Sequence, residues 1–201
     1  MAAVSNITDE DRQVLRVEMR AHCDAGERFF AEHASAIATC AAAMADRFFA
    51  GATLLVFGSG AAVTDAQHNA VEYVHPVLPG CRALPALSLS NDVAILAGGT
   101  VTDTYAHQIR LLGRTEDIAL AFASFPPAPA IVAGLEAATK CGMEVIVLST
   151  GGGIPDIGNH HFHVAGHDAL LAQELHLATY HMLWELVHII LNHRGIAAEA
   201  P

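Results

Sequence analysis

Two pairs of polar side chains in this sequence have the types and the spacing of a metal site. His68 and Glu72 are four residues apart, so on a helix both lie on one face, one turn apart. Gln173 and His181 are eight residues apart, which on a helix separates them by about 80° around the axis. Two nitrogens and two oxygens brought together suit zinc or another divalent ion. These four residues are the candidate metal ligands.

The remaining histidines carry weaker signals. His176 and His188 lie in the same apolar segment as His181, where they support the metal ligands, face a partner chain or simply pack. Four more form a loose cluster without helical spacing, which favours an exposed sheet edge over a second metal site: His160, His161, His163 and His167. Any single His-x-x-x-Glu pair is more often an ordinary surface pair than a ligand pair. A metal site is indicated only because the His68–Glu72 and Gln173–His181 pairs occur together.

The hydrophobic pattern predicts an α/β fold that positions these residues. Short apolar runs predict five buried strands, at residues 53–60, 83–90, 117–124, 144–150 and 160–165. Helical spacing is found at residues 64–74, 92–99, 102–114, 128–142 and 169–194, the last capped by Asp168 and stopped by Gly195. Strands that alternate with helices in this way predict a parallel sheet covered on both faces, a three-layer α/β/α architecture.

The first fifty residues predict two helices that precede the sheet. Thr8 and Asp9 are suited to cap the first helix, and a break is expected near Asp24-Ala25-Gly26. These helices serve core packing or, as the alternative, an oligomer interface. We therefore expect one domain over residues 1–201, with helices over 1–50 and an α/β core over 51–195.

Composition limits the partners and the compartment. Hydrophobic residues make up 53% of the 201 residues and charged residues only 15%, which suits a chain that buries surface in an oligomer. The net charge is −11 and no basic cluster occurs, which argues against direct nucleic-acid or anionic-membrane partners. The N-terminal segment is polar and no long apolar run occurs. We therefore expect no signal peptide and no membrane span. Four widely spaced cysteines predict reduced, mostly buried thiols in a cytoplasmic protein.

Several segments together resemble the sugar isomerase (SIS) domain family. They follow in order along nearly the whole chain: GSGAAVTDAQHNAVEYV, LPALSLSND, QIRLLGR, GLEAATKCGMEVIVLS and QELHLATYHMLWELV. The likeness is greatest to the phosphoheptose isomerase branch, which converts sedoheptulose 7-phosphate to a heptose phosphate. The resemblance implies a five-stranded, flavodoxin-like parallel sheet and a homo-oligomer, a tetramer or dimer, with sites between subunits. It also implies zinc at the positions of His68, Glu72, Gln173 and His181.

The chemistry that the resemblance implies is aldose–ketose isomerisation. A proton leaves the carbon beside a carbonyl and returns one carbon away, which needs a base, an acid and a group that polarises the oxygens. Glu72 is the candidate base and His181 the candidate acid. Metal binding weakens a carboxylate as a base, so the two roles of Glu72 compete.

The phosphate-binding loops of this branch are altered here. The resemblance implies a substrate site at six residues: Ser59, Gly60, Asp65, Ser124, Ser149 and Thr150. In the first loop Ser59 and Ala62 replace an asparagine and a serine, and residues 123–128 read ASFPPA where the branch has a serine-rich run. Pro76 stands where an arginine is common, and an Asn-Asp pair before QIRLLGR is missing, for which the earlier Asn91-Asp92 does not substitute. Prolines 126 and 127 would remove two N–H donors at a helix start.

Three functions remain open from the sequence. The first is a metal-dependent isomerase that acts on a sugar phosphate or on a less anionic sugar derivative. The second is a non-catalytic, metal-binding SIS protein that acts as a regulatory or scaffolding oligomer. The third is a structural oligomer whose histidines only pack.

Overall fold

The structure is a computed structural model that describes residues 7–91, 102–166 and 168–195. The chain forms two compact units, residues 1–34 and 35–201, and each is described by itself. The predicted domain limits, one domain with a boundary near residue 50, stay a prediction.

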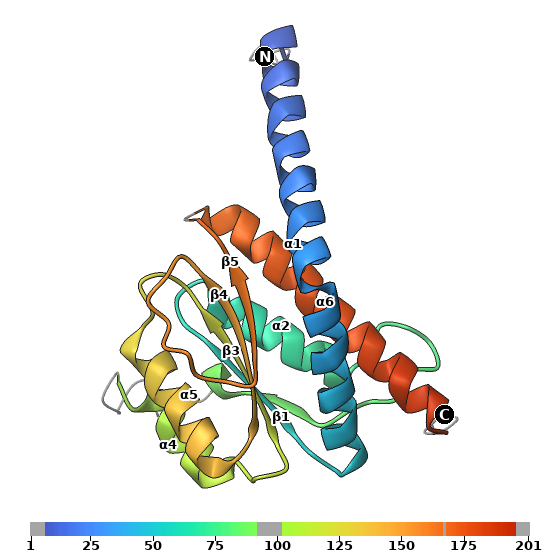
Figure 1. Cartoon of the computed structure of the whole chain (residues 1–201), viewed down its shortest axis with the longest axis vertical. Helices are drawn as coiled ribbons and strands as arrows, with labels where there is room; N and C mark the ends of the chain where they lie inside the picture. Colours follow the sequence, from blue (N-terminus) through green and yellow to red (C-terminus); the bar gives the residue numbers. More distant parts are fainter. Residues whose placement is uncertain (1–6, 92–101, 167, 196–201) are drawn as a thin grey trace, which may run out of the picture. The chain divides into compact units, whose positions relative to one another are not determined.

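A five-stranded parallel sheet forms the centre of the second unit (Figure 1). Its strands are β1 (Leu54–Gly58), β2 (Ala86–Ser88), β3 (Ile118–Ala123), β4 (Glu144–Thr150) and β5 (His160–Val164). They lie in the order β2-β1-β3-β4-β5, and every neighbouring pair is parallel. This is the flavodoxin-like order, whose direction of winding reverses between β1 and β3. The predicted α/β class and five parallel strands are confirmed.

Helices cover both faces of this sheet. Those after the first strand are α2 (Ala62–Val74), α4 (Thr104–Leu112), α5 (Pro129–Cys141) and α6 (Ala169–His193), with a 3₁₀ turn η1 (Leu89–Asn91). Asp168 caps α6 as predicted, because its Oδ1 accepts the N–H groups of Leu170 and Leu171 at 3.0 and 3.1 Å. The helical turns predicted for residues 92–99 lie outside the described residues.

Side-chain alternation along β3 shows which helices lie on which face. Ala121 packs with residues of α4 and α5, including Tyr105 and Leu135, in a buried cluster. The next residue, Phe122, points the other way and meets Tyr180 of α6 edge-on, with ring centroids 5.8 Å apart. The sheet thus separates the α4 and α5 layer from the layer that holds α2 and α6.

The N-terminal segment forms one helix instead of the predicted two. Helix α1 (Asp9–Phe49) is continuous over 41 residues, so the break predicted at Asp24-Ala25-Gly26 is wrong. A single glycine costs a helix only about 1 kcal/mol relative to alanine, and its neighbours here are good helix formers. The predicted start is confirmed, because the Asp11 N–H donates to Thr8 Oγ1 at 3.1 Å and the Thr8 N–H donates to Asp11 Oδ2 at 2.9 Å.

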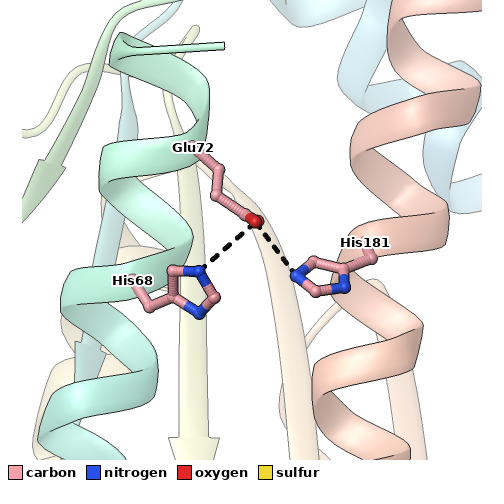
Figure 2. A group of neighbouring side chains, drawn as sticks. All are labelled: His68, Glu72 and His181. Carbon is pink, nitrogen blue, oxygen red and sulfur yellow. Dashed lines mark ion pairs between the residues drawn. The ribbon is translucent and has the colours of Figure 1, made fainter. Parts of the chain in front are cut away.

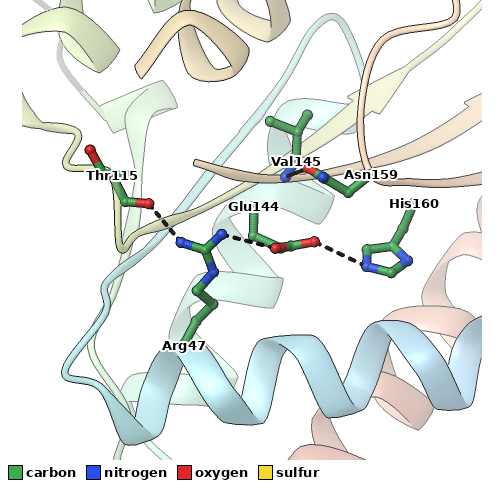
Figure 3. Close-up of polar contacts among 6 residues, drawn as sticks. All are labelled: Arg47, Thr115, Glu144, Val145, Asn159 and His160. Atoms are coloured by element: carbon green, nitrogen blue, oxygen red, sulfur yellow. Dashed lines mark hydrogen bonds and ion pairs between the residues drawn. The ribbon is translucent and has the colours of Figure 1, made fainter. Parts of the chain in front are cut away.

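Polar contacts fix the end of α1 to the sheet (Figure 3). The Arg47 guanidinium donates to the Thr115 carbonyl at 2.7 Å and lies 3.1 Å from the Glu144 carboxylate. The other oxygen of Glu144 lies 3.2 Å from His160 Nε2 at the start of β5. Arg47 and His160 are therefore neighbours of one carboxylate, which joins α1 to β4 and β5.

Two predictions about the whole sequence can be compared with the described residues. No helix among them is long and apolar enough to cross a membrane. The four cysteines, Cys23, Cys40, Cys81 and Cys141, form no disulfide in the structure, but only Cys40 is buried, so the prediction that most of them are buried is wrong.

Candidate metal centre and substrate cavity

His68, Glu72 and His181 converge on one point between α2 and α6 (Figure 2). Glu72 reaches from α2 toward α6, and its Oε1 lies 3.0 Å from His181 Nε2 and 3.4 Å from His68 Nε2. One ligand atom from each of the three residues lies within 4.8 Å of the others. The helical spacing of His68 and Glu72 thus places both on the face that meets α6, as predicted.

The donor set and its burial fit a divalent ion. Glu72 Oε2 is buried without a hydrogen-bond partner. His181 Nε2 is also buried, and although it lies 3.0 Å from Glu72 Oε1, the two atoms are not aligned as a hydrogen bond. A buried polar atom left without a partner is costly, so a ligand or ion normally satisfies it. Two imidazole nitrogens and a carboxylate oxygen are common zinc ligands. Among the described residues, this is the one group of three histidine, cysteine or acidic side chains arranged in this way.

Aromatic residues of α6 hold the α2 side of this cluster in place. Tyr180 OH lies 2.8 Å from His68 Nδ1, which leaves Nε2 directed toward Glu72. Burial raises the pKa of the Tyr180 phenol, so the hydroxyl stays neutral near pH 7. The Trp184 indole N–H donates to the Glu72 carbonyl at 3.0 Å. Tyr180 thus plays the part of the outer hydrogen-bond partner that metal-bound histidines usually have.

Gln173, the fourth predicted ligand, binds Asp65 instead. Its side-chain nitrogen donates to the two carboxylate oxygens of Asp65 at 3.1 and 3.3 Å. Eight residues on a helix correspond to a rise of about 12 Å, which places Gln173 two turns before His181. The structure therefore brings three of the four predicted ligands together and pairs the fourth with another predicted site residue.

A cavity of about 330 Å³ lies at the carboxyl ends of β1, β3 and β4. This is the place where open parallel sheets bind ligands. It contains five of the six predicted substrate-binding residues: Ser59, Gly60, Asp65, Ser124 and Thr150. Gln173 and His176 of α6 and the Phe122 side of β3 complete one wall. Its volume is at the lower end of the range of ligand pockets, about 300–1,000 Å³.

Ser149, the sixth predicted residue, does not line this cavity. It is buried, and its hydroxyl lies 2.6 Å from His161 Nε2 and 3.0 Å from His163 Nδ1 of the edge strand β5. Its carbonyl accepts a bond from His176 Nε2 at 3.2 Å. Ser149 and Thr150 are consecutive on a strand and point to opposite faces, which explains why only Thr150 reaches the cavity.

The prolines of the segment after β3 precede helix α5 instead of beginning it. The cap residue is Ala128 and the first helical residue is Pro129, so Pro126 and Pro127 lie in the loop. The helix begins where the sequence predicts it, and the two prolines lie directly before its cap, where they remove two N–H donors beside the helix start. Phe125 lies against the turn after β4, where a Cβ atom added at Gly151 would lie 2.2 Å from that of Phe125.

A second cavity, of about 250 Å³, adjoins the metal cluster. Its lining includes Glu72 and His181 together with Val77, Leu78, Trp184 and Glu185. The cluster therefore faces a hollow of its own, while Asp65, about two turns earlier on α2, faces the first cavity.

Several residues that surround the metal cluster and the cavity carry only a weak signal in the sequence. His176 is buried in the wall of the first cavity, and burial lowers its pKa to about 4. His188 bonds the carbonyls of Trp184 and Arg82, so its contacts are within the chain. Tyr180 and Trp184 belong to an apolar helix pattern. The only sequence signal for their role is that their polar groups follow His176 and His181 by four and three residues, which places them on the same helix face. His167 lies outside the described residues.

Known proteins share both the sequence and this fold. The SIS domain family matches residues 20–150. The phosphoheptose isomerase of Desulfovibrio desulfuricans is 30% identical, over 97% of this chain and 95% of that protein. The phosphoheptose isomerase of Thermodesulfovibrio yellowstonii is 31% identical, over 82% and 85%. The solved phosphoheptose isomerase of Francisella tularensis superposes with a TM-score of 0.77 and 25% identity, over 90% of this chain and 98% of that one. That of Neisseria gonorrhoeae shares the fold with the same TM-score at 20% identity, over 88% and 97%.

Proposed function

Because the chain belongs to the SIS domain family and its relatives are named phosphoheptose isomerases, we propose that it is an aldose–ketose isomerase with a divalent-metal centre. The observation that carries this proposal is the convergence of His68, Glu72 and His181, with a buried carboxylate oxygen left unpartnered. The substrate class is a sugar phosphate or a less anionic sugar derivative, which would extend from the cavity at the ends of β1, β3 and β4 to Glu72 and His181 in the hollow beside the metal cluster.

In this proposal Glu72 moves the proton between the two carbons. It takes the proton from the carbon beside the carbonyl, and the electron pair of that C–H bond forms a C=C bond. The former carbonyl oxygen takes a proton from the Nδ1–H of His181, the ring nitrogen that a metal on Nε2 leaves free, which gives an enediol. In the reverse sense, His181 accepts the proton of the neighbouring hydroxyl and Glu72 returns its proton to the other carbon. No oxidant or reductant is needed.

His68, Glu72 and His181 would hold the metal, which when bound polarises the sugar oxygens. Gln173, the predicted fourth ligand, would have to exchange its bond to Asp65 for the ion. Glu72 has two oxygens for its two roles, Oε1 between the histidines and Oε2 without a partner. Zinc fits this donor set, and other divalent ions of similar preference fit as well.

The test is an isomerisation assay of the protein, stripped with chelator and reloaded with zinc. Sedoheptulose 7-phosphate and sedoheptulose are supplied, and the aldose product is measured. Glu72→Gln is expected to lower turnover by about a hundredfold or more, the usual worth of a positioned acid–base group. Glu136→Gln on α5, an exposed carboxylate on the other face of the sheet, serves as the matched control and should change nothing. Equal turnover by chelated and reloaded protein contradicts the metal proposal.

A non-catalytic SIS protein is the second candidate. The proline-containing loop before α5 and the alanine caps of α2 and α5 favour it, because they offer few donors to a phosphorylated substrate. This candidate predicts zinc binding by His68, Glu72 and His181 with no turnover of either sugar.

We also propose that the protein is a cytoplasmic homo-oligomer, a dimer or tetramer. Free thiols support the compartment. The first unit carries exposed apolar side chains that need a cover, Val14, Leu15, Val17 and Met19, each more than half exposed. Light scattering coupled to gel filtration tests the proposal, and a monomer at micromolar concentration contradicts it.

A further inference from the structure

The cavity at the ends of β1, β3 and β4 offers no lysine or arginine, among the described residues that line it, to hold a phosphate. Resting on the isomerase function proposed above, we propose that this cavity binds an uncharged polyhydroxy sugar in preference to its phosphate ester. The starts of α2 and α6 line the cavity, and Ser124, from the segment that leads to α5, lines it as well.

The charge of the cavity is negative. Among the described residues that line it there is no lysine or arginine, and Asp65 supplies a carboxylate. His176 adds no positive charge near pH 7, because burial lowers its pKa to about 4. A phosphate dianion would therefore meet a like charge without a neutralising partner.

The first-turn N–H groups of α2 are engaged by the turn that precedes the helix. The N–H groups of Ala62, Val63 and Thr64 donate to the carbonyls of the turn before them, at 3.2, 3.3 and 3.1 Å. The cap residue, Ala61, provides no side-chain donor. A helix start binds phosphate through such N–H groups, and here the turn itself uses them.

At the starts of α5 and α6, prolines and a carboxylate reduce the number of N–H groups that an anion could use. Before and at the start of α5, Pro126, Pro127 and Pro129 have no N–H at all, and the N–H groups of Ile131 and Val132 donate to the Ala128 carbonyl. At the start of α6, the Asp168 carboxylate accepts the N–H groups of Leu170 and Leu171. The carboxylate that caps α6 also adds negative charge beside a cavity that Leu170 lines.

The groups that remain suit hydroxyls. Ser59, Ser124 and Thr150 present hydroxyls that donate and accept, and the Asp65–Gln173 pair adds a carboxylate and an amide. Between these polar groups the wall is apolar, with Phe122 and several alanines that would contact the C–H faces of a sugar. This mixture is typical of a site for a neutral ligand oriented by a few polar contacts.

The experiment compares binding of sedoheptulose and sedoheptulose 7-phosphate to zinc-loaded protein by calorimetry. The neutral sugar is expected to bind about tenfold more tightly or better, since the phosphate of the ester would leave water for a cavity that repels it through Asp65 and offers no cation. Inorganic phosphate at millimolar concentration should not compete. Asp65→Asn should reduce the difference in affinity between the neutral sugar and the ester, because it removes the charge that repels the phosphate. Asp24→Asn, the same change at an exposed position of α1, should leave that difference in affinity unaltered.

Tighter binding of the ester, competition by inorganic phosphate, or binding of neither sugar overturns the inference. The outcome is separable from that of the proposed function. Faster turnover of the ester with tighter binding leaves the isomerase in place and removes the neutral-sugar preference. Tighter binding of the neutral sugar with no turnover of either compound supports the preference and removes the isomerase.

Discussion

At the scale of single residues, the metal proposal depends on how Glu72 is held. Its carboxylate faces two imidazoles, and one of them is oriented by Tyr180 from the neighbouring helix. When His68 Nδ1 carries the ring proton, it donates that proton to the Tyr180 hydroxyl. Nε2 then has a free lone pair that can bind an ion. Tyr180 is therefore a positioning residue whose removal should be felt by the metal.

We predict that Tyr180→Phe weakens zinc binding about ten- to a hundredfold, the usual effect of removing an outer hydrogen-bond partner. Competition against a chromogenic chelator measures the affinity. Tyr73→Phe is the matched control, because the Tyr73 hydroxyl is buried without a hydrogen-bond partner in the described residues and its loss should leave zinc affinity unchanged. Equal affinities for the two variants would refute the role of Tyr180.

His176 makes the fold sensitive to acid. Burial lowers its pKa to about 4, from 6.5, so the folded state keeps the ring neutral while the unfolded state takes up a proton as pH falls through 6.5. The contribution of neutral His176 to the free energy of unfolding is therefore complete above pH 6.5, and it is lost progressively as the pH falls toward 4. The loss should amount to about 3 kcal/mol.

His176→Gln, which keeps a side-chain N–H donor for the Ser149 carbonyl, should remove this part of the pH dependence. Urea unfolding between pH 7 and pH 4 gives the free energy of unfolding of each protein. His193→Gln, an exposed change on the same helix, should retain the slope of the unaltered protein. Parallel curves for His176→Gln and the unaltered protein would show that His176 is not the cause.

At the scale of elements, the loop after β3 and the turn after β4 depend on each other. Gly151 has φ of +79°, and a Cβ atom there would come within 2.2 Å of the Cβ atom of Phe125. Its neighbour Gly152 has open space around the same position and no left-handed φ. Residues on both sides of this contact, Ser124 and Thr150, line the cavity.

Gly151→Ala is expected to destabilise the fold by about 2 kcal/mol or more, since left-handed strain and a clash add together. Gly152→Ala should cost less than about 1 kcal/mol. Thermal unfolding measures both, and ligand binding should fall only with Gly151→Ala because Ser124 is displaced. A similar melting temperature for both variants would mean that the two loops are independent.

The elements could be predicted from the sequence where the apolar pattern was continuous. The core of β1, β3 and β4 coincides with the apolar runs to within two residues at each end, and α6 begins at its expected cap. The break at Gly26 was wrong because one glycine is a weak signal inside forty residues of helix formers. Pro126 and Pro127 were expected beside a helix start, and they lie in the loop directly before the cap Ala128, while a third proline, Pro129, takes the first helical position.

At the scale of the whole molecule, the site is assembled by contacts that local spacing does not contain. Helical arithmetic places His68 beside Glu72, yet the approach of His181 depends on how α6 packs beside α2. The same packing pairs Gln173 with Asp65, two side chains 108 positions apart in the sequence. Ser149 was expected in the substrate site from the resemblance, and the alternation of side chains along β4 turns it instead toward His161 and His163.

The central claim is that the His68, Glu72 and His181 centre moves a proton between two carbons of a sugar. Hydrogen exchange tests this most directly. Zinc-loaded protein is incubated with sedoheptulose or its 7-phosphate in deuterated water, and NMR follows deuterium at the carbon beside the carbonyl. The account predicts incorporation by the unaltered protein and almost none by Glu72→Gln or by metal-stripped protein. No exchange with either sugar, or equal exchange by Glu72→Gln, would contradict it.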